Sequence, residues 1–141
     1  MGTLTAIIGL AGSGKSHHLL KLIQESPMGA YAKDEVFLVG DVNQNYQKVY
    51  LNLRNDINVF IVEAEFNFKS QQDAFIQKIH EDIPEIEIKW LAFEKDLAKA
   101  NNNVMKRTNK PDPKGHAEQN TRIFPHYNIP VGADELEIFE L

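Results

Sequence analysis

Apolar and polar residues alternate in blocks along the chain, and these blocks predict strands separated by helices. Short continuous apolar runs are typical of strands that are buried on both faces. Such runs occupy residues 4–9, 35–39, 58–64 and 86–93. Between them, apolar residues recur at spacings of three and four, which predicts helices with one buried face. These helical segments are 15–24, 43–55, 70–80 and 96–106.

The last third of the chain is less regular. Residues 106–117 are polar and proline-broken, which predicts a loop. A short helix near 118–127 and a final strand near 136–139 are expected to follow. Strands that alternate with helices favour an α/β fold in which helices cover both faces of a parallel sheet.

Length and composition narrow the possible classes of protein. A chain of 141 residues fits one domain, so we expect residues 1–141 to form a single unit. The absence of cysteine excludes a disulfide framework, a thiolate metal site and a cysteine nucleophile. No apolar stretch approaches the ~20 residues that span a bilayer, and no basic region precedes the apolar start, unlike in a signal peptide. These features favour a cytoplasmic protein without a membrane partner.

Charge is unevenly distributed along the sequence. The net charge of −5 argues against a protein that stably binds duplex nucleic acid. Residues 104–122 nevertheless contain five lysines and arginines against two acidic residues. A basic segment in an acidic protein favours one anionic ligand over a polymer, although a solvated loop explains the same charges.

A glycine-rich sequence follows the first predicted strand and leads into the first predicted helix. It matches the Walker A pattern G-x-x-x-x-G-K-[ST] in full. Glycines let the backbone curl closely around a polyphosphate, and the N–H groups at the start of the helix face the anion. We expect Lys15 to reach the β- and γ-phosphates and the Ser16 hydroxyl to bind Mg²⁺. The predicted nucleotide-binding residues are Gly9, Leu10, Ala11, Gly12, Ser13, Gly14, Lys15 and Ser16.

Acidic residues follow the second and third predicted strands. Ligands of open parallel sheets bind at the carboxyl ends of the strands, so acids there are candidates for chemistry. We expect Asp41 to orient or deprotonate a phosphoryl acceptor and Glu65 to hold the metal ion through water. The position of Glu63 makes it a candidate for the same role as Glu65, but in an extended chain its side chain points to the opposite face. Helix capping by Asp41 and a solvated strand end at Glu65 are the structural alternatives.

Two arginines bracket the polar segment that follows the fourth strand and its helix. Arginine side chains neutralise the charge on a transferring phosphoryl group, and a closing loop excludes water from it. We therefore expect a lid at about 106–122 that carries Arg107 and Arg122. The predicted catalytic residues are Lys15, Asp41, Arg107 and Arg122.

With a phosphate loop, strand-end acids and an arginine-bearing lid in this order, the sequence resembles the small P-loop kinases. This group includes nucleotide, nucleoside and polynucleotide kinases and their zeta-toxin-like relatives. Residues 61–67, Ile-Val-Glu-Ala-Glu-Phe-Asn, resemble the third-strand segment of phage polynucleotide kinases. Residues 93–107 resemble the helix and lid entry of small phage and bacterial P-loop proteins.

The resemblance implies a three-layer fold with a five-stranded parallel sheet in the order 2-3-1-4-5. It also implies Mg-ATP as the phosphoryl donor, an acid after the second strand (here Asp41) and lid arginines (here Arg107 and Arg122). Where the family usually has a metal-side aspartate, this chain has Glu65. The short segment between the second and third strands has one arginine, Arg54, which disfavours a nucleoside monophosphate as the acceptor.

These features lead to several hypotheses on function. The first is a kinase that transfers the γ-phosphoryl group of ATP to a hydroxyl or phosphate of a small or nucleic-acid-derived acceptor. A non-kinase ATPase or nucleotide-binding switch is the alternative, and a degenerate kinase that serves as a structural subunit is the third. A GTPase is disfavoured because residues 109–112, which match the guanine-binding pattern N-K-x-D, lie in a polar loop and not after an apolar strand.

Overall fold

The structure is a computed structural model that describes residues 1–25, 36–39, 42–107 and 112–141. Its strands are β1 (Leu4–Ile8), β2 (Val36–Val39), β3 (Asn58–Val62), β4 (Ile88–Phe93) and β5 (Asp134–Leu136). Its helices are α1 (Lys15–Gln24), α3 (Val42–Arg54), α4 (Lys69–Asp82), α5 (Leu97–Lys106) and α6 (Pro113–Ile123), with the 3₁₀ turns η2 (Ala64–Asn67) and η3 (Phe124–His126). Within these described ranges, no helix has both the length and the apolarity needed to cross a membrane.

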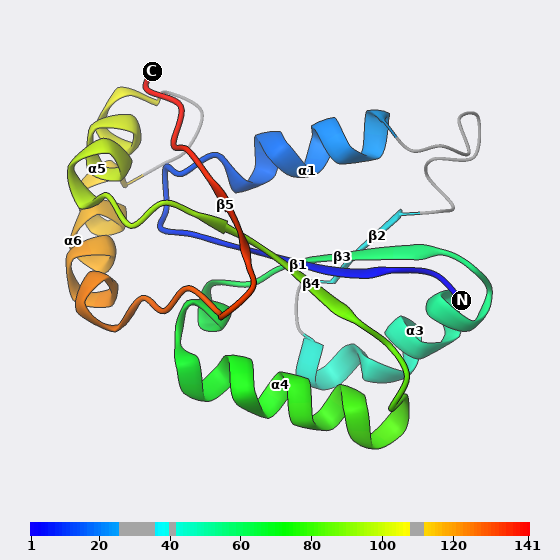
Figure 1. The fold of residues 1–141 in the computed structure, drawn as a ribbon. Coiled ribbons are helices and arrows are strands. Elements are labelled where there is room, and N and C mark those ends of the chain that lie inside the picture. Colours follow the sequence, from blue (N-terminus) through cyan, green and yellow to red (C-terminus); the bar gives the residue numbers. More distant parts are fainter. Residues whose placement is uncertain (26–35, 40–41, 108–111) are drawn as a thin grey trace.

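A parallel sheet forms the central layer. The strands lie in the order β2-β3-β1-β4-β5, and each neighbouring pair is parallel. α1 lies on one face of the sheet, and α3 and α4 lie on the other (Figure 1). α5 and α6 lie side by side beyond the carboxyl ends of β1 and β4 (Figure 1). The predicted α/β class, a parallel sheet with helices on both faces, is confirmed.

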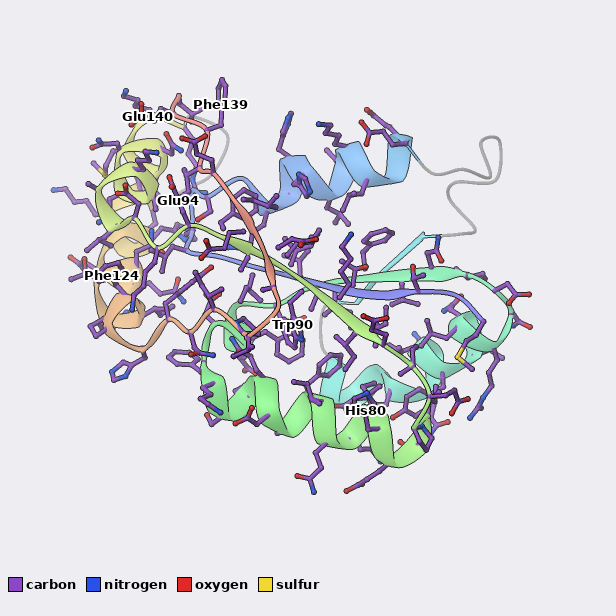
Figure 2. All side chains as sticks on the ribbon, in the orientation of Figure 1. His80, Trp90, Glu94, Phe124, Phe139 and Glu140 are labelled. Atoms are coloured by element: carbon purple, nitrogen blue, oxygen red, sulfur yellow. The ribbon has the colours of Figure 1, made fainter. Side chains whose placement is uncertain are left out.

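β1 and most of β4 bury side chains on both faces of the sheet, which explains their continuous apolar sequences. Leu4, Ala6 and Ile8 of β1 pack in one core cluster with Trp90 of β4. Figure 2 shows this tryptophan on the side of the sheet that α4 covers. Ile7 points the other way, into a second cluster that includes side chains of α1 and α5. Because successive side chains of β1 point to opposite faces of the sheet, this strand packs against the helices on both sides.

The segment after α5 differs from the predicted loop over 106–117 and helix near 118–127. A helix already begins at Pro113. Its cap is Asp112, whose Oδ1 accepts a hydrogen bond from the Gly115 N–H at 3.1 Å. Proline suits the first turn of a helix because its missing N–H has no partner to lose there. One of the prolines that indicated a loop is thus the residue that starts α6.

The final strand also lies elsewhere than predicted near 136–139. β5 pairs with β4 through Leu91 beside Asp134 and Phe93 beside Leu136. Beyond β5, the side chain of Ile138 is buried in the core cluster that includes side chains of α1 and α5. Its burial explains the apolar residue at this position. The last residues therefore pack beside α5 without extending the sheet.

Candidate functional site

The loop between β1 and α1, here called the glycine loop (residues 9–16), has a backbone that requires glycine at two positions. Gly12 and Gly14 have φ angles of 86° and 106°, in the left-handed region that other residues rarely adopt. A Cβ atom at Gly12 would also lie 2.4 Å from a backbone oxygen of α5. The Ser13 N–H donates to the Leu10 carbonyl at 3.1 Å and closes the turn. The glycine spacing in the sequence thus corresponds to a tightly curled backbone.

Lys15 is the first residue of α1, and its side chain folds back over the glycine loop. Its Nζ donates to the carbonyl oxygens of Gly9 at 2.7 Å and Leu10 at 3.0 Å. The first N–H groups of a helix have no acceptor within the helix, and those of α1 belong to Lys15, Ser16 and His17. The ammonium group and the positive end of the α1 dipole therefore both place positive charge at the glycine loop.

A cavity of about 670 Å³ opens beside the glycine loop. Its volume is within the range typical of small-molecule sites. The wall is built from the loop and the start of α1, the end of α5, one turn of α6 and the chain after β5. The lining residues are Ala11, Gly12, Gly14, Lys15, Ser16, His17, Asn103, Arg107, His116, Phe139 and Leu141.

Arg107 follows α5 directly and is one of the residues that line this cavity. Its backbone N–H donates to the Asn103 carbonyl at 3.1 Å, which fixes the point where the side chain leaves the helix. The Nε and Nη2 atoms are buried, and within the described part of the chain neither has a hydrogen-bond partner. Burying unsatisfied donors of a charged group is costly, so this arrangement favours an anionic ligand.

Arg122, the other predicted lid arginine, does not line the cavity. It is exposed on α6, two positions after Asn120, which is buried and marks the inward side of the helix. Two residues turn an α-helix by about 200°. His116 lies four positions before Asn120, shares its side of α6 and lines the cavity. The local sequence does not distinguish His116 from a solvated residue. Its spacing of four from Asn120 indicates that it faces inward only when the inward side of α6 is known.

Of the predicted carboxylates, Glu63 and Glu65 do not line this cavity. Asp41 lies outside the described residues. Glu65 is exposed within η2, and Glu63 is half-buried at the N-cap position of that turn. Because β3 ends at Val62, the extended chain assumed for these two glutamates is replaced by a 3₁₀ turn. In the ranges that the structure describes, no three His, Asp or Glu side chains are grouped so that they could hold a metal ion.

Two buried asparagine side chains pair with single residues of the glycine loop. Asn67 of η2 accepts from the Gly9 N–H at 2.9 Å and donates to the Gly9 carbonyl at 3.0 Å. Asn120 of α6 does the same with Ala11, at 2.8 Å in both directions. Each side-chain amide thus satisfies both polar groups of one loop residue. The sequence predicted neither role: Asn67 ends the 61–67 segment that resembles phage polynucleotide kinases, but the resemblance gave it no contact, and Asn120 does not stand out from its local pattern.

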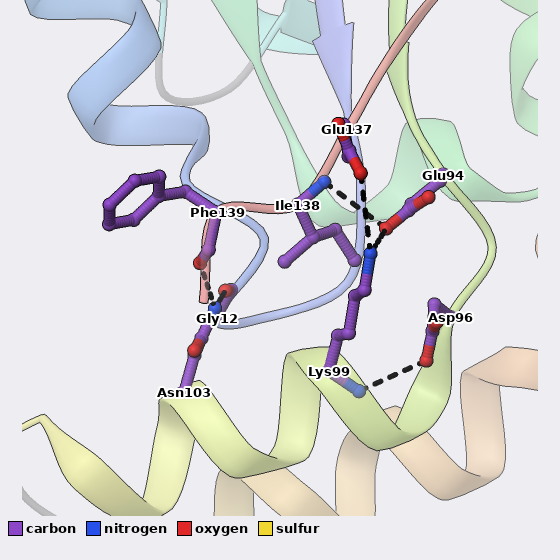
Figure 3. Close-up of polar contacts among 8 residues, drawn as sticks. All are labelled: Gly12, Glu94, Asp96, Lys99, Asn103, Glu137, Ile138 and Phe139. Atoms are coloured by element: carbon purple, nitrogen blue, oxygen red, sulfur yellow. Dashed lines mark hydrogen bonds and ion pairs between the residues drawn. The ribbon is translucent and has the colours of Figure 1, made fainter. Parts of the chain in front are cut away.

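A third asparagine, Asn103 of α5, joins the glycine loop to the last residues of the chain. Its Nδ2 donates to the carbonyls of Gly12 at 2.9 Å and Phe139 at 2.6 Å (Figure 3). Its Oδ1 accepts from the Leu141 N–H at 2.9 Å. The Phe139 side chain, 80% exposed, and the Leu141 side chain are thereby held at the wall of the cavity.

An ion-pair cluster fixes the chain after β5 against α5. Glu94 Oε1 accepts from Lys99 Nζ at 2.7 Å and from the Ile138 N–H at 3.3 Å (Figure 3). Lys99 also lies 3.7 Å from Glu137. The hydrogen bond with Glu94 raises the pKa of Lys99, because the bond stabilises the charged form of the lysine. Asp96 caps α5 by accepting from the Lys99 N–H at 3.0 Å.

Comparisons with known proteins identify a shared fold. Neither a family model nor a curated protein matches the sequence. Among solved structures, a gluconokinase from Sinorhizobium meliloti 1021 is similar, with a TM-score of 0.55 and 12% sequence identity. The match covers 99% of this chain and 84% of the gluconokinase chain. At this level of identity the similarity shows a kinase-like α/β fold.

Proposed function

We propose that the protein is an ATP-dependent phosphotransferase, a kinase, whose donor nucleotide binds in the cavity beside the glycine loop. The observation that carries the proposal is that Lys15, the start of α1 and Arg107 line one cavity, and that Arg107 Nε and Nη2 have no hydrogen-bond partner among the described residues. Groups of this kind bind polyphosphates. The fold shared with a gluconokinase supports transfer of the phosphoryl group to an acceptor.

The triphosphate would lie along the glycine loop, with the N–H groups at the start of α1 as donors. Lys15 would exchange its two carbonyl partners for oxygens of the β- and γ-phosphates. Arg107, which lines the same cavity, would contact the phosphoryl oxygens. Arg122 would join them if α6 moved, since its side chain is exposed in this structure.

The residues at the cavity fit a nucleotide-bound Mg²⁺ ion. Ser16 is exposed at the start of α1 and offers a hydroxyl oxygen, the hard type of ligand that Mg²⁺ prefers. Mg²⁺ commonly keeps several waters and takes phosphate oxygens as its other ligands, which needs no preformed cluster of acids. Glu65 of η2 does not line the cavity and would have to come closer to act on the ion through water. The ion, when bound, would neutralise charge on the phosphates.

Apolar surface for the nucleobase is present beside the cationic groups. Phe139 and Leu141 line the same cavity as Arg107, and both side chains are largely exposed. A base is flat and apolar on its faces and would pack against such a wall. The phosphates would then lie at the glycine loop and the base beneath the last residues of the chain.

The acceptor would carry a hydroxyl or phosphate group that Asp41 orients after β2. We test the proposal by measuring Mg-ATP consumption with nucleosides, nucleotides, 5′-hydroxyl oligonucleotides and gluconate. The kinase predicts that one acceptor raises consumption above the background of the Lys15→Ala variant. ATP binding without stimulation by any acceptor would favour a nucleotide-binding switch or an ATPase. No heat with Mg-ATP or Mg-GTP in calorimetry would overturn nucleotide binding itself.

A further inference from the structure

Three asparagines on three separate elements surround the glycine loop, and all are buried. Asn67, Asn103 and Asn120 are 1%, 3% and 1% exposed, respectively. A buried side-chain amide needs partners for its donors and its acceptor, and for each asparagine the loop backbone supplies at least one of them. The loop shape is therefore specified by residues far away in the sequence and not by its glycines alone.

Two of these asparagines belong to the α5–α6 pair. Asn103 holds the Gly12 carbonyl, and Asn120 holds both polar groups of Ala11. Asn120 Nδ2 also donates to Asn101 Oδ1 at 3.0 Å, which ties α6 to α5 at the same point. The contacts of Asn120 with Ala11 exist only while α6 is docked against the loop.

We propose that Asn120 is a positioning residue that couples the docking of α6 to nucleotide binding by the glycine loop. The inference rests on the proposed function, because it assumes that the loop binds phosphates. A ligand that favours the curled loop stabilises the docked α6, and a docked α6 raises the affinity for the ligand by the same factor. The coupling also keeps His116, on the inward side of α6, at the cavity wall.

Gln72 offers a matched control for Asn120. Its side chain is 2% exposed and makes three hydrogen bonds, as many as Asn120 makes. Its partners are Phe66 and Asn128, and neither belongs to the glycine loop. Asn120→Leu and Gln72→Met each replace a buried amide by an apolar side chain of similar size.

The experiment measures the dissociation constant of Mg-ADP by calorimetry together with Tm. Both variants are expected to lower Tm, because each leaves buried polar groups without partners. Asn120→Leu is expected to weaken Mg-ADP binding about tenfold, while Gln72→Met stays within about twofold of wild type. Equal affinity of wild type and Asn120→Leu would overturn the coupling and leave the proposed function intact. Absence of Mg-ADP binding by wild type would overturn both.

Hydrogen exchange on the wild-type protein tests the same coupling without a variant. Mg-ADP is expected to slow exchange of the α6 amides at least threefold, while exchange in α4 changes little. α4 serves as the reference because the loop contacts described here come from η2, α5 and α6. Slower exchange in the glycine loop with unchanged exchange in α6 would contradict the inference.

Discussion

Lys15 Nζ lies 2.7 Å from the carbonyl oxygen of Gly9, the residue that begins the glycine loop six positions earlier. The side chain thereby bridges the two ends of the loop and holds its charge at the cavity. To contact a phosphate, Lys15 has to leave this carbonyl and that of Leu10. Two bonds from the ammonium group to neutral carbonyls are then replaced by bonds to phosphate oxygens, in which both partners carry a charge.

Replacing Lys15 by methionine is expected to abolish measurable Mg-ATP binding while the protein still folds. The alkyl chain is kept, and the loss of the two bonds to loop carbonyls should lower the free energy of unfolding by about 1–2 kcal/mol. Lys21→Met is the control, because Lys21 is an exposed lysine of the same helix. Calorimetry and urea denaturation measure both quantities. Wild-type affinity in Lys15→Met would contradict the proposed role of the lysine.

Alanine at Gly12 is expected to destabilise the protein far more than alanine at Gly132. Both glycines have positive φ angles, 86° and 82°. The left-handed backbone alone costs a non-glycine residue about 1–2 kcal/mol. At Gly12 the new Cβ would also meet the Ala100 carbonyl oxygen at 2.4 Å, whereas nothing lies within 4 Å at Gly132. The difference between the two variants in urea denaturation therefore measures the steric contact of the loop with α5.

The sequence predicted the parts of the site that depend on local chemistry. The β1 strand and the curl at Gly12 and Gly14 follow from patterns that a few adjacent residues determine. The start of α6 was also encoded locally, since an Asp-Pro pair is a helix-start signal, but the proline was interpreted as a loop residue. The expectation failed there because proline favours both a loop and the first turn of a helix.

The remaining parts of the site depend on tertiary contacts and could not be predicted. The sequence around Asn67 and Asn120 does not show that these side chains bond to Gly9 and Ala11; only the fold brings them together. Phe139 lies in a segment that was expected to be a strand, yet its carbonyl is held by an asparagine of α5. Hydrogen bonds between residues separated by about 36 to 109 positions leave no periodic pattern in one sequence.

A tyrosine–aspartate pair away from the cavity gives a pH-dependent contribution to stability. Tyr50 of α3 donates a short hydrogen bond to Asp82 at the end of α4. This bond, together with that from Lys78, lowers the pKa of Asp82 below its usual value of 3.8. A carboxyl group with a lowered pKa stabilises the fold above about pH 4, and the stabilisation is lost as the pH falls through its folded-state pKa.

Tyr50→Phe is therefore expected to be less stable than wild type at pH 7, and the difference should shrink towards pH 2. Tyr46→Phe is the control, because Tyr46 stacks on Phe75 and its pKa is raised mainly by burial. Urea midpoints measured from pH 2 to pH 7 report the effect. A constant difference in urea midpoint between Tyr50→Phe and wild type across this range would show that the bond from Tyr50 to ionised Asp82 does not stabilise the fold.

Arg107→Met is expected to lower ligand affinity without lowering the stability of the fold. Its Nε and Nη2 are buried without protein partners within the described ranges, so removing them should leave the free energy of unfolding unchanged or raise it by up to about 1 kcal/mol. Affinity for Mg-ATP should fall about tenfold or more, since a charge-assisted contact with the phosphates is lost.

Arg122→Met tests whether Arg122 contacts the nucleotide, as the sequence predicts, or stays away from the cavity, as in the structure. Arg122 is exposed and does not line the cavity, so nucleotide affinity should stay within about twofold of wild type. A parallel loss of acceptor-stimulated ATP turnover in Arg107→Met and Arg122→Met would instead mean that α6 turns during the reaction and brings the second arginine to the phosphates. Measuring binding and turnover on both variants distinguishes these cases, because a residue that acts only after such a movement affects kcat while the dissociation constant of Mg-ATP stays unchanged.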